Sequence, residues 1–531
     1  MNRPAEPRSC TSLADTENRW LGRVVRFALL IFALRVLYLI LDNPYELAGD
    51  EAQYWDWSRR IDWSYYSKGP GIAWLIGLST RLFGHEAWAV RFPAAVSGSL
   101  TILACGWMTA RLGHGQPRAP FYAAVMAAFA PFLFATSQFM TIDAPFFAAW
   151  AIAAAIALRI LTTSRSTLWL WCALGITVGV GVLLKYTMLL LIPGLVIGFV
   201  SACRLRPGLR LGRSGPLLAV VLALVTMLPI AIWNQMNGWP TVAHLLGHLG
   251  APGGDLEPAR RWFYNPLWTL EAVAVQMLLI APGISLLVIL ALRRVSFVDD
   301  PTRSGIRLLT WMAWPVFGLY FLVSFATNVE ANWPAAGWIT LIPVAAVGLP
   351  TRLCSPGYNP WKFGWHAILT IAVIAAPLIL FGPHLMRAPG VHLLPFHGAI
   401  EKGLQRVSRS EEEALCVAEI QQRIAEETGL DPFIVGAHYG RAALIAYYHP
   451  GHPVVFSGAS ALGDRESSYD YFADTSLERE DLLGRPAILI GTQPRKWVTG
   501  LVFERIEALP DHRDISVGYG YLGTTESFDE R

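Results

Sequence analysis

The chain has few charged residues for its length. Only 15% of its 531 residues are Asp, Glu, Lys or Arg, whereas 54% are hydrophobic. Soluble domains carry about 25% charged residues, so a soluble protein of this size could not cover its surface with this composition. The same figures exclude disorder and coiled coils, and the net charge of +3 does not suggest a nucleic-acid partner. What remains is a polytopic membrane protein, with or without a soluble part.

Cysteine and lysine are also scarce. The six cysteines form no disulfide framework, because three lie in apolar runs and Cys416 is alone in the polar C-terminal part. Lys68 and Lys185 are the only lysines before Lys362, although arginine is common. Acidic residues are unevenly placed, since 22 of the 39 lie from Arg387 onward. The chain therefore divides near residue 385 into a membrane part and a water-soluble part.

Apolar runs of about 20 residues predict membrane-spanning helices. We count eleven, at about 22–41, 87–110, 118–136, 143–162, 167–184, 186–203, 215–234, 265–292, 306–327, 333–350 and 363–384. The first is not a cleaved signal peptide, because its apolar run is long and a polar aromatic loop follows it. The shorter run 70–84 is interrupted by Gly77 and predicts an interfacial or re-entrant helix.

The distribution of arginine predicts the orientation. With residues 1–21 in the cytoplasm, arginine gathers in the inner loops, whereas the outer loops 137–142 and 328–332 contain no Lys or Arg. An odd number of spans then places the C-terminal part on the periplasmic side of the inner membrane. We expect a transmembrane domain over 22–384, with a first outer loop at 42–86, and a soluble α/β domain over 385–531.

The C-terminal part shows an α/β pattern. Residues 410–427 have the periodicity of an amphipathic helix, and 440–449 predict a second helix. Three short apolar runs, 432–436, 453–456 and 487–491, predict buried strands. Its glycines lack the Lys and Ser or Thr of a phosphate loop, which argues against nucleotide binding.

The first outer loop carries two groups of candidate residues. Asp50 and Glu51 lie just after the first span, beside Tyr54 and Trp55. A carboxylate positioned there could take a proton from a hydroxyl, although an adjacent acidic pair is equally typical of a solvated loop. Further along, Lys68 precedes Gly-Pro-Gly, which favours a fixed, compact cation suited to a phosphate oxygen. The alternative for this lysine is simple anchoring at the membrane interface.

Three later segments carry candidates on the same side. Asp143 begins a span and could simply cap the helix. Lys185 lies between two spans with almost no loop, where a lysine must either snorkel to the interface or meet an anion. The outer turn before the tenth span contains Glu330, Asn332 and Trp333.

One outer loop, 235–264, contains two histidines at helical spacing. His244 and His248 are four residues apart and could share one face of a helix. This spacing can bind a metal, but no Glu follows the first histidine as in the H-E-x-x-H motif. Two polar histidines without a metal are the alternative.

Seven short motifs occur in order along the chain. They are Asp50 to Trp55, Tyr65 to Pro70, Arg91 to Pro93, Ser137 to Pro145, Leu184 to Tyr186, Asn237 to Pro240 and Glu330 to Pro334. Together they resemble the bacterial branch of the dolichyl-phosphate-mannose:protein mannosyltransferase family. These are glycosyltransferases of the GT-C fold, including aminoarabinose lipid A transferases and Rgt-type galacturonosyltransferases. The resemblance covers about residues 22–384.

The resemblance implies a donor sugar linked to polyprenyl phosphate, an envelope lipid, glycan or protein as acceptor, and an active site on the outer face. The resemblance maps the family's catalytic acids onto Asp50, with Glu51 beside it, and onto Asp143, and it maps the lysines that bind the donor phosphate onto Lys68 and Lys185. We further expect Tyr66 to bind the donor phosphate. The substrate-binding residues that we expect are Tyr54, Trp55, His244, Glu330, Asn332 and Trp333. Asp50 takes the role of general base. Ser67 replaces a glutamate that contributes to a metal site in the aminoarabinose transferases, which leaves a divalent metal open and argues against that specificity.

Two non-enzymatic functions compete with this interpretation. A transporter or flippase of lipid-linked sugars would place its ionisable residues near the middle of the membrane, whereas here the acids gather in outer loops. A periplasmic sensor with a multi-span anchor would leave the first-loop residues unexplained.

Overall fold

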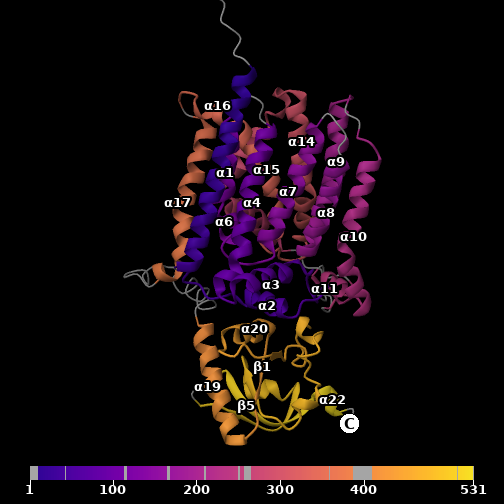
Figure 1. Cartoon of the computed structure of the whole chain (residues 1–531), viewed down its shortest axis with the longest axis vertical. Helices are drawn as coiled ribbons and strands as arrows, with labels where there is room; N and C mark the ends of the chain where they lie inside the picture. Colours follow the sequence, from indigo (N-terminus) through magenta and orange to yellow (C-terminus); the bar gives the residue numbers. More distant parts are fainter. Residues whose placement is uncertain are drawn as a thin grey trace, which may run out of the picture. The chain divides into compact units, whose positions relative to one another are not determined.

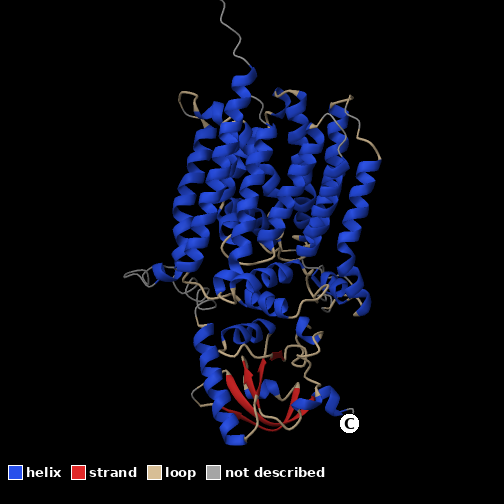
Figure 2. Ribbon diagram, in the orientation of Figure 1, coloured by secondary structure: helices blue, strands red, loops and turns tan. Residues whose placement is uncertain are grey.

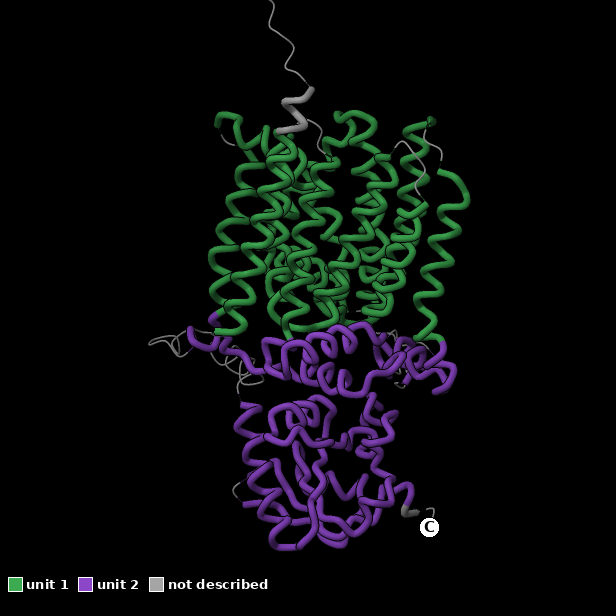
Figure 3. Tube along the Cα trace, viewed as in Figure 1, with its two compact units in different colours: residues 1–42, 91–231, 260–380 green, residues 43–90, 232–259, 381–531 purple. Residues whose placement is uncertain are grey.

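The computed structural model describes residues 10–41, 43–112, 116–163, 168–208, 211–248, 252–255, 265–357, 359–386, 409–510 and 512–529. The chain forms two compact units, drawn in different colours in Figure 3. Unit 1 comprises residues 1–42, 91–231 and 260–380, and unit 2 comprises residues 43–90, 232–259 and 381–531. The segment expected as the first outer loop therefore belongs to the same unit as the C-terminal part.

Unit 1 is helical (Figure 1). Its helices, three of which continue into unit 2, are α1 (Cys10–Leu41), α4 (Ala87–Leu112), α5 (Ala119–Phe129), α6 (Pro131–Thr136), α7 (Asp143–Thr162), α8 (Leu168–Leu184), η1 (Tyr186–Leu190), α9 (Leu191–Leu205), α10 (Ser214–Met236), α12 (Pro266–Ile280), α13 (Pro282–Leu292), η2 (Val295–Phe297), α14 (Asp300–Val323), α15 (Ala336–Val347), α16 (Leu349–Leu353) and α17 (Pro360–Met386).

Seven helices in the described part of the chain are long and apolar enough to cross a membrane, or up to eight if one bent pair counts as a span. The bent pair is α12 and α13, which meet at 96°. The bend lies at Ala281, whose φ of 77° is unusual for a residue with a side chain, followed by a proline that begins the next helix. In the described residues the structure thus gives a multi-pass protein with seven or eight apolar spans of full length, where eleven were expected. The other three expected spans coincide with the shorter helices α5, α8 and α15.

Small residues let the helices of unit 1 approach closely. A Cβ atom on Gly194 of α9 would lie 2.6 Å from the carbonyl oxygen of Trp311 and 2.7 Å from the Cα of Met312 in α14. Membrane helices associate through such contacts because lipid supplies no hydrophobic driving force between them. Close packing of this kind holds α9 and α14 together in the unit that contains Asp143 and Lys185.

Unit 2 contains a five-stranded sheet and several helices (Figure 2). Its elements are α2 (Gly49–Arg59), α3 (Gly71–Phe83), α11 (Pro240–His248), α19 (Ser410–Thr428), β1 (Phe433–Gly436), α20 (Tyr439–Tyr448), β2 (Val455–Ser457), η4 (Ser468–Asp470), η5 (Glu480–Leu482), β3 (Ala487–Ile490), α21 (Pro494–Trp497), β4 (Leu501–Ala508), β5 (Ile515–Thr524) and α22 (Thr525–Asp529).

The sheet is mixed, with strand order β2-β1-β3-β5-β4. The first three strands are parallel, and β5 pairs antiparallel with both β3 and β4. The three expected strands and both expected helices are confirmed as β1, β2, β3, α19 and α20. The hairpin of β4 and β5 was not predicted from the sequence.

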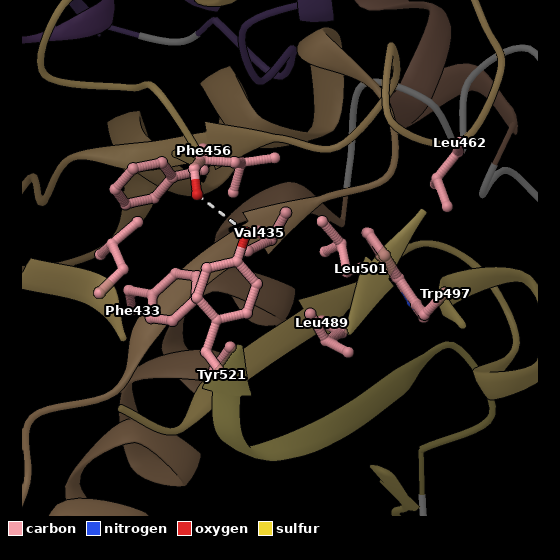
Figure 4. Close-up of a cluster of buried hydrophobic side chains, with 11 residues drawn as sticks. Phe433, Val435, Phe456, Leu462, Leu489, Trp497, Leu501 and Tyr521 are labelled. Carbon is pink, nitrogen blue, oxygen red and sulfur yellow. Dashed lines mark hydrogen bonds between the residues drawn. The ribbon is translucent and has the colours of Figure 1, made fainter. Parts of the chain in front are cut away.

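A hydrophobic core lies against the sheet (Figure 4). The ring of Phe433 packs against those of Phe456 and Tyr521, with centroids 5.5 and 5.2 Å away. The Tyr521 hydroxyl donates to the carbonyl of Leu477 at 2.9 Å. The hydroxyl of a buried tyrosine usually forms a hydrogen bond, because burying it without one costs free energy. The hydrogen bond therefore ties the loop at Leu477 to the sheet.

The first-loop helix α2 packs on α20 of the C-terminal part within unit 2. An added Cβ on Gly49 would lie 3.4 Å from the Cα of Gly440, and the rings of Trp55 and Tyr447 are 4.9 Å apart. The buried Asp56 accepts a hydrogen bond from the Tyr469 hydroxyl at 2.8 Å. A buried carboxylate needs such partners, so α2 and the C-terminal part depend on each other for their packing.

Candidate active site

Three candidate residues from distant segments meet in unit 1. The Nζ of Lys185 lies 2.7 Å from Oδ1 of Asp143, and the side-chain amide of Asn332 donates to Oδ2 of Asp143 at 2.8 Å. Asp143 is the first residue of α7, and Asn332 lies in the turns before α15. Lys185 has an extended backbone, with φ of −154° and ψ of 126°, which breaks the chain between α8 and η1. This break directs a lysine from an otherwise apolar region to the carboxylate.

The cluster bears on two alternatives that the sequence left open. Asp143 does not cap α7, because the capping position is Ile142, no side chain caps the helix, and both carboxylate oxygens of Asp143 bond elsewhere. The side chain of Lys185 is only 10% exposed and forms an ion pair with Asp143, so this lysine meets an anion. It also lies 5.6 Å from the ring of Phe146. The structure therefore favours an ion pair with Asp143 over snorkelling for Lys185, and it shows no side-chain cap at the start of α7.

The other two candidates of this segment lie outside the cluster. Glu330 is exposed, and its backbone carbonyl accepts from the amide of Trp333 at 3.1 Å. The Trp333 ring packs near Tyr320, with centroids 5.4 Å apart. The hydroxyl of Tyr320 in turn lies 3.1 Å from that of Thr187. Tyr320 was missed by the sequence analysis, because a tyrosine within an apolar helix gives no signal of its own.

The two acids of the first loop have different environments in unit 2. Glu51 is fully buried, and its Oε2 accepts from the backbone N–H of Ala48 at 3.0 Å. This contact satisfies an N–H at the start of α2, so Glu51 already has a structural role. Asp50 is exposed at the N-terminus of the same helix. Of the two carboxylates, Asp50 is the one that a substrate can reach.

The aromatic residues of this motif are part of the core of unit 2. Trp55 is 1% exposed and donates from Nε1 to Nδ1 of His85 at 2.9 Å. Tyr54 is equally buried, and the Nζ of Lys68 lies 5.6 Å from its ring centroid. The carbonyl of Lys68 accepts from the N–H of Tyr65 at 3.1 Å, which closes a tight turn. The burial of Tyr54 and Trp55 favours a structural role over the predicted contact with substrate.

A second polar cluster in unit 2 contains Tyr66 and His244. The Tyr66 hydroxyl donates to Oδ2 of Asp255 at 2.6 Å, and Nδ1 of His244 lies 2.8 Å from the same oxygen. Nε2 of His244 lies 3.2 Å from Nε2 of His248. Arg465 of the C-terminal part places Nη2 3.0 Å from Oδ1 of Asp255. We call these five residues the Asp255 network.

Burial and neighbouring charges set the protonation states in this network. Burial lowers the pKa of His244 to about 4, although the hydrogen bond to Asp255 opposes this shift. Burial would raise the pKa of Asp255, but hydrogen bonds from Tyr66 and His244 outweigh it and lower the pKa. Burial raises the pKa of Tyr66, as does its bond to Asp255. At neutral pH the network therefore holds a carboxylate, a neutral imidazole and a protonated phenol.

Metal binding was left open by the sequence and stays open. Among the described residues, no group of three or more His, Cys, Asp or Glu side chains is arranged to hold a metal ion. His244 and His248 face each other, but Arg465 places Nη1 3.5 Å from Nε2 of His248. A guanidinium at that position competes with a cation for the same space. Asp255 and Arg465 were not predicted as site residues, because only the fold brings them to Tyr66 and His244.

The fold and these clusters define a multi-pass helical membrane protein with polar residues grouped at the ends of its helices. Residues 67–233 match the model of the family described as dolichyl-phosphate-mannose-protein mannosyltransferase. The chain is 29% identical over 350 residues to the lipid A galacturonosyltransferase RgtD of Rhizobium johnstonii, covering 64% of this chain and 67% of that protein. These matches agree with the family resemblance that the motifs indicated.

Two further relatives extend the likeness over most of the chain. The undecaprenyl phosphate-alpha-4-amino-4-deoxy-L-arabinose arabinosyl transferase of Pectobacterium carotovorum is 25% identical over 401 residues, covering 70% of this chain and 68% of that protein. The crystal structure of ArnT from Cupriavidus metallidurans in the apo state has a TM-score of 0.58 at 16% identity, covering 94% of this chain and 98% of that chain. The latter shows that the two proteins share a fold.

Proposed function

We propose that the protein is an integral-membrane glycosyltransferase that moves a sugar from a polyprenyl-phosphate donor to an envelope acceptor. The observation that carries this proposal is the meeting of Asp143, Lys185 and Asn332, three motif residues distant in sequence, within hydrogen-bond distance. The name of the Pectobacterium relative supports an undecaprenyl-phosphate sugar as the donor. The name of the Rhizobium relative supports lipid A as the acceptor. ArnT from Cupriavidus metallidurans has also been crystallised bound to undecaprenyl phosphate.

We infer a topology of eleven spans for this enzyme. The seven long helices, the bent pair and the short helices α5, α8 and α15 together supply that number. The arginine-rich inner loops then place residues 1–21 in the cytoplasm and the C-terminal part in the periplasm. With this orientation the domains are the transmembrane part, 22–384, and a periplasmic part, 385–531. The reaction takes place on the periplasmic face of the inner membrane.

The proposed chemistry follows from the charges. Glycosyl transfer passes through an oxocarbenium-like state, so the acceptor hydroxyl needs a base and the departing phosphate needs cations. Asp50 is the exposed carboxylate and acts as the base. Lys68 and Lys185 are each proposed as a cation for the donor phosphate. Tyr66 is proposed as a further phosphate ligand, and because its single hydroxyl proton is donated to Asp255, the hydroxyl must turn from that carboxylate to bind phosphate. Asp143 balances the charge of Lys185 before the donor arrives, which is less costly than leaving a lysine unpaired in an apolar region.

The remaining candidates have supporting roles in this proposal. His244, Glu330, Asn332 and Trp333 contact the sugar or the acceptor, while Tyr54 and Trp55 support the loop from the core of unit 2. Glu51 orders the first turn of α2 and so fixes the direction of Asp50. A divalent metal is not required by these roles.

Single-turnover transfer with purified protein tests the proposal. Wild-type protein should transfer sugar from a defined undecaprenyl-phosphate donor, with galacturonic acid or aminoarabinose as the sugar, to lipid A. Loss of a general base costs about 10²–10⁴-fold in rate, so Asp50→Asn should nearly abolish transfer. Glu51→Gln is the matched control and should be milder, because the amide oxygen of glutamine can still accept from Ala48.

The same assay separates the competing functions. If wild-type protein carries the donor across a vesicle membrane without forming product, it is a transporter and the proposal is wrong. If Asp50→Asn retains more than about a tenth of the wild-type rate while Asp143→Asn is inactive, the base is Asp143 instead.

A further inference from the structure

The C-terminal part of the chain reaches the predicted substrate residues of unit 2 through one arginine. Arg465 lies between β2 and η4, and its guanidinium forms an ion pair with Asp255 at 3.0 Å. The side chain of Arg465 is 24% exposed, and that of Asp255 is 11% exposed. A largely desolvated pair of this kind holds its partners more firmly than an exposed surface pair does. Arg465 therefore fixes the position of the Asp255 carboxylate.

The carboxylate of Asp255 in turn orients two residues that were predicted from the sequence. One of its oxygens accepts from the Tyr66 hydroxyl at 2.6 Å and lies 2.8 Å from Nδ1 of His244. An ionised carboxylate can only accept, so Nδ1 of His244 carries the proton and Nε2 is left as the acceptor nitrogen. The ring of Tyr471, six residues beyond Arg465, stacks on Tyr66 at 5.7 Å between centroids. The same segment thus supports Tyr66 from two directions.

We propose that Arg465 is a positioning residue of the transfer reaction, which through Asp255 sets the direction of the Tyr66 hydroxyl and the neutral tautomer of His244. This inference rests on the proposed function, in which Tyr66 binds the donor phosphate and His244 contacts the substrate. It assigns the C-terminal part a role in the reaction. The alternative is that Arg465 only stabilises the packing of unit 2.

The charges around His244 give this proposal a specific signature. The groups that face its ring are Tyr66, His248, Asp255 and Arg465. Burial lowers the pKa of His244 to about 4, and the positive charge of Arg465 adds to the lowering. Removing that charge raises the pKa of His244. Because the imidazole must be neutral to accept a proton or hydrogen bond, the rate of the variant should fall at a higher pH than that of wild type.

The test compares pH–rate profiles of the full chain between about pH 3 and 7, a range that includes the wild-type pKa of His244. Arg465→Met should move the acidic limb of the profile to higher pH. On that limb the rate follows the fraction of neutral His244, so each unit by which the pKa of His244 rises should lower the rate about tenfold relative to wild type. Arg465→Lys should restore the profile in part, since a lysine can still pair with Asp255. Arg505→Met is the matched control, because Arg505 forms an exposed ion pair with Glu507 elsewhere in the C-terminal part.

A second measurement keeps the inference independent of the proposed activity. Histidine-labelled full-length protein, with His244 assigned by a His244→Gln variant, gives the pKa of His244 directly by NMR. Arg465→Met should raise it, whether or not the donor chosen for the assay is the correct one. A pH–rate profile parallel to that of wild type, or an unchanged His244 titration, would show a packing role only and overturn the inference. A wild-type protein that transfers no sugar would instead contradict the proposed function.

Discussion

The ion pair between Lys185 and Asp143 offers the most direct test of the site in unit 1. Both side chains are nearly buried, at 10% and 6% exposure, and their charged atoms are 2.7 Å apart. Removing one partner of such a pair leaves an uncompensated buried charge and costs about 3–5 kcal/mol. Lys185→Met should therefore destabilise the protein by about that amount, because its carboxylate partner keeps only the bond from Asn332. Asp143→Leu should lower the free energy of unfolding by a similar amount, because Lys185 would then be a buried charge without its ion-pair partner.

The double variant separates stability from function. Replacing both members of a buried pair with apolar residues is often close to neutral, so Lys185→Met with Asp143→Leu should be far less destabilised than the sum of the single variants. Equilibrium unfolding in mixed micelles measures all three. Asn332→Ala is a useful comparison, since it removes one hydrogen bond to a charged group, worth about 1.5–3 kcal/mol.

Transfer assays on the same proteins then assign the role of the pair. If either member of the pair takes part in the reaction, the double variant should be stable but inactive. If the pair only supports the fold, the double variant should transfer sugar at close to the wild-type rate. The reasoning fails if each single variant unfolds within about 0.5 kcal/mol of wild type and the two effects simply add, since that is the behaviour of independent, solvated side chains.

Two further predictions concern the packing and topology of the membrane part. An alanine at Gly98 would place its Cβ 2.7 Å from Nη1 of Arg35 and closer still to Ser137, so Gly98→Ala should destabilise the protein by about 1–3 kcal/mol in an unfolding titration. Gly22→Ala meets no atom within 4 Å and is the control, expected to be neutral or slightly stabilising. A phosphatase reporter fused after residue 400 should be active if the C-terminal part is periplasmic. An active cytoplasmic reporter at that point, with a silent phosphatase, would reverse the topology.

The sequence predicted the helical segments well because apolar runs and arginine-rich ends are local signals. Seven of the expected spans are helices long and apolar enough to cross a membrane, whereas the others fall on the short helices α5, α8 and α15 and on α12 and α13, which meet at 96° at Ala281. In the C-terminal part, β1, β2 and β3 are short and fully buried, and a run of apolar residues predicts such strands. The strand β5 was missed because three of its ten residues are glycines, which break the pattern of a strand.

The candidate residues were predicted with mixed success for a similar reason. The sequence predicted Asp143, Lys185 and Asn332 as site residues, and in the structure these three side chains lie within hydrogen-bond distance. The sequence could not say that Asp143 would meet a lysine instead of capping its own helix, because both are equally compatible with a carboxylate at the start of α7. Likewise, the sequence around Trp55 is typical of an aromatic residue at the membrane interface, whereas in the structure the Trp55 ring packs against Tyr447 of α20.

Arg465 illustrates the limit of local reasoning most clearly. It lies in a polar stretch of the C-terminal part among other charged residues, and nothing in its neighbourhood distinguishes it from the partly exposed Arg479 or the exposed Arg505. Its partner Asp255 is more than 200 residues earlier in the chain. What separates a positioning arginine from a solvating one is burial of the ion pair and the bonds its partner makes onward to Tyr66 and His244. Both are properties of the folded unit, which is why the role of the C-terminal part could be inferred only after the fold was known.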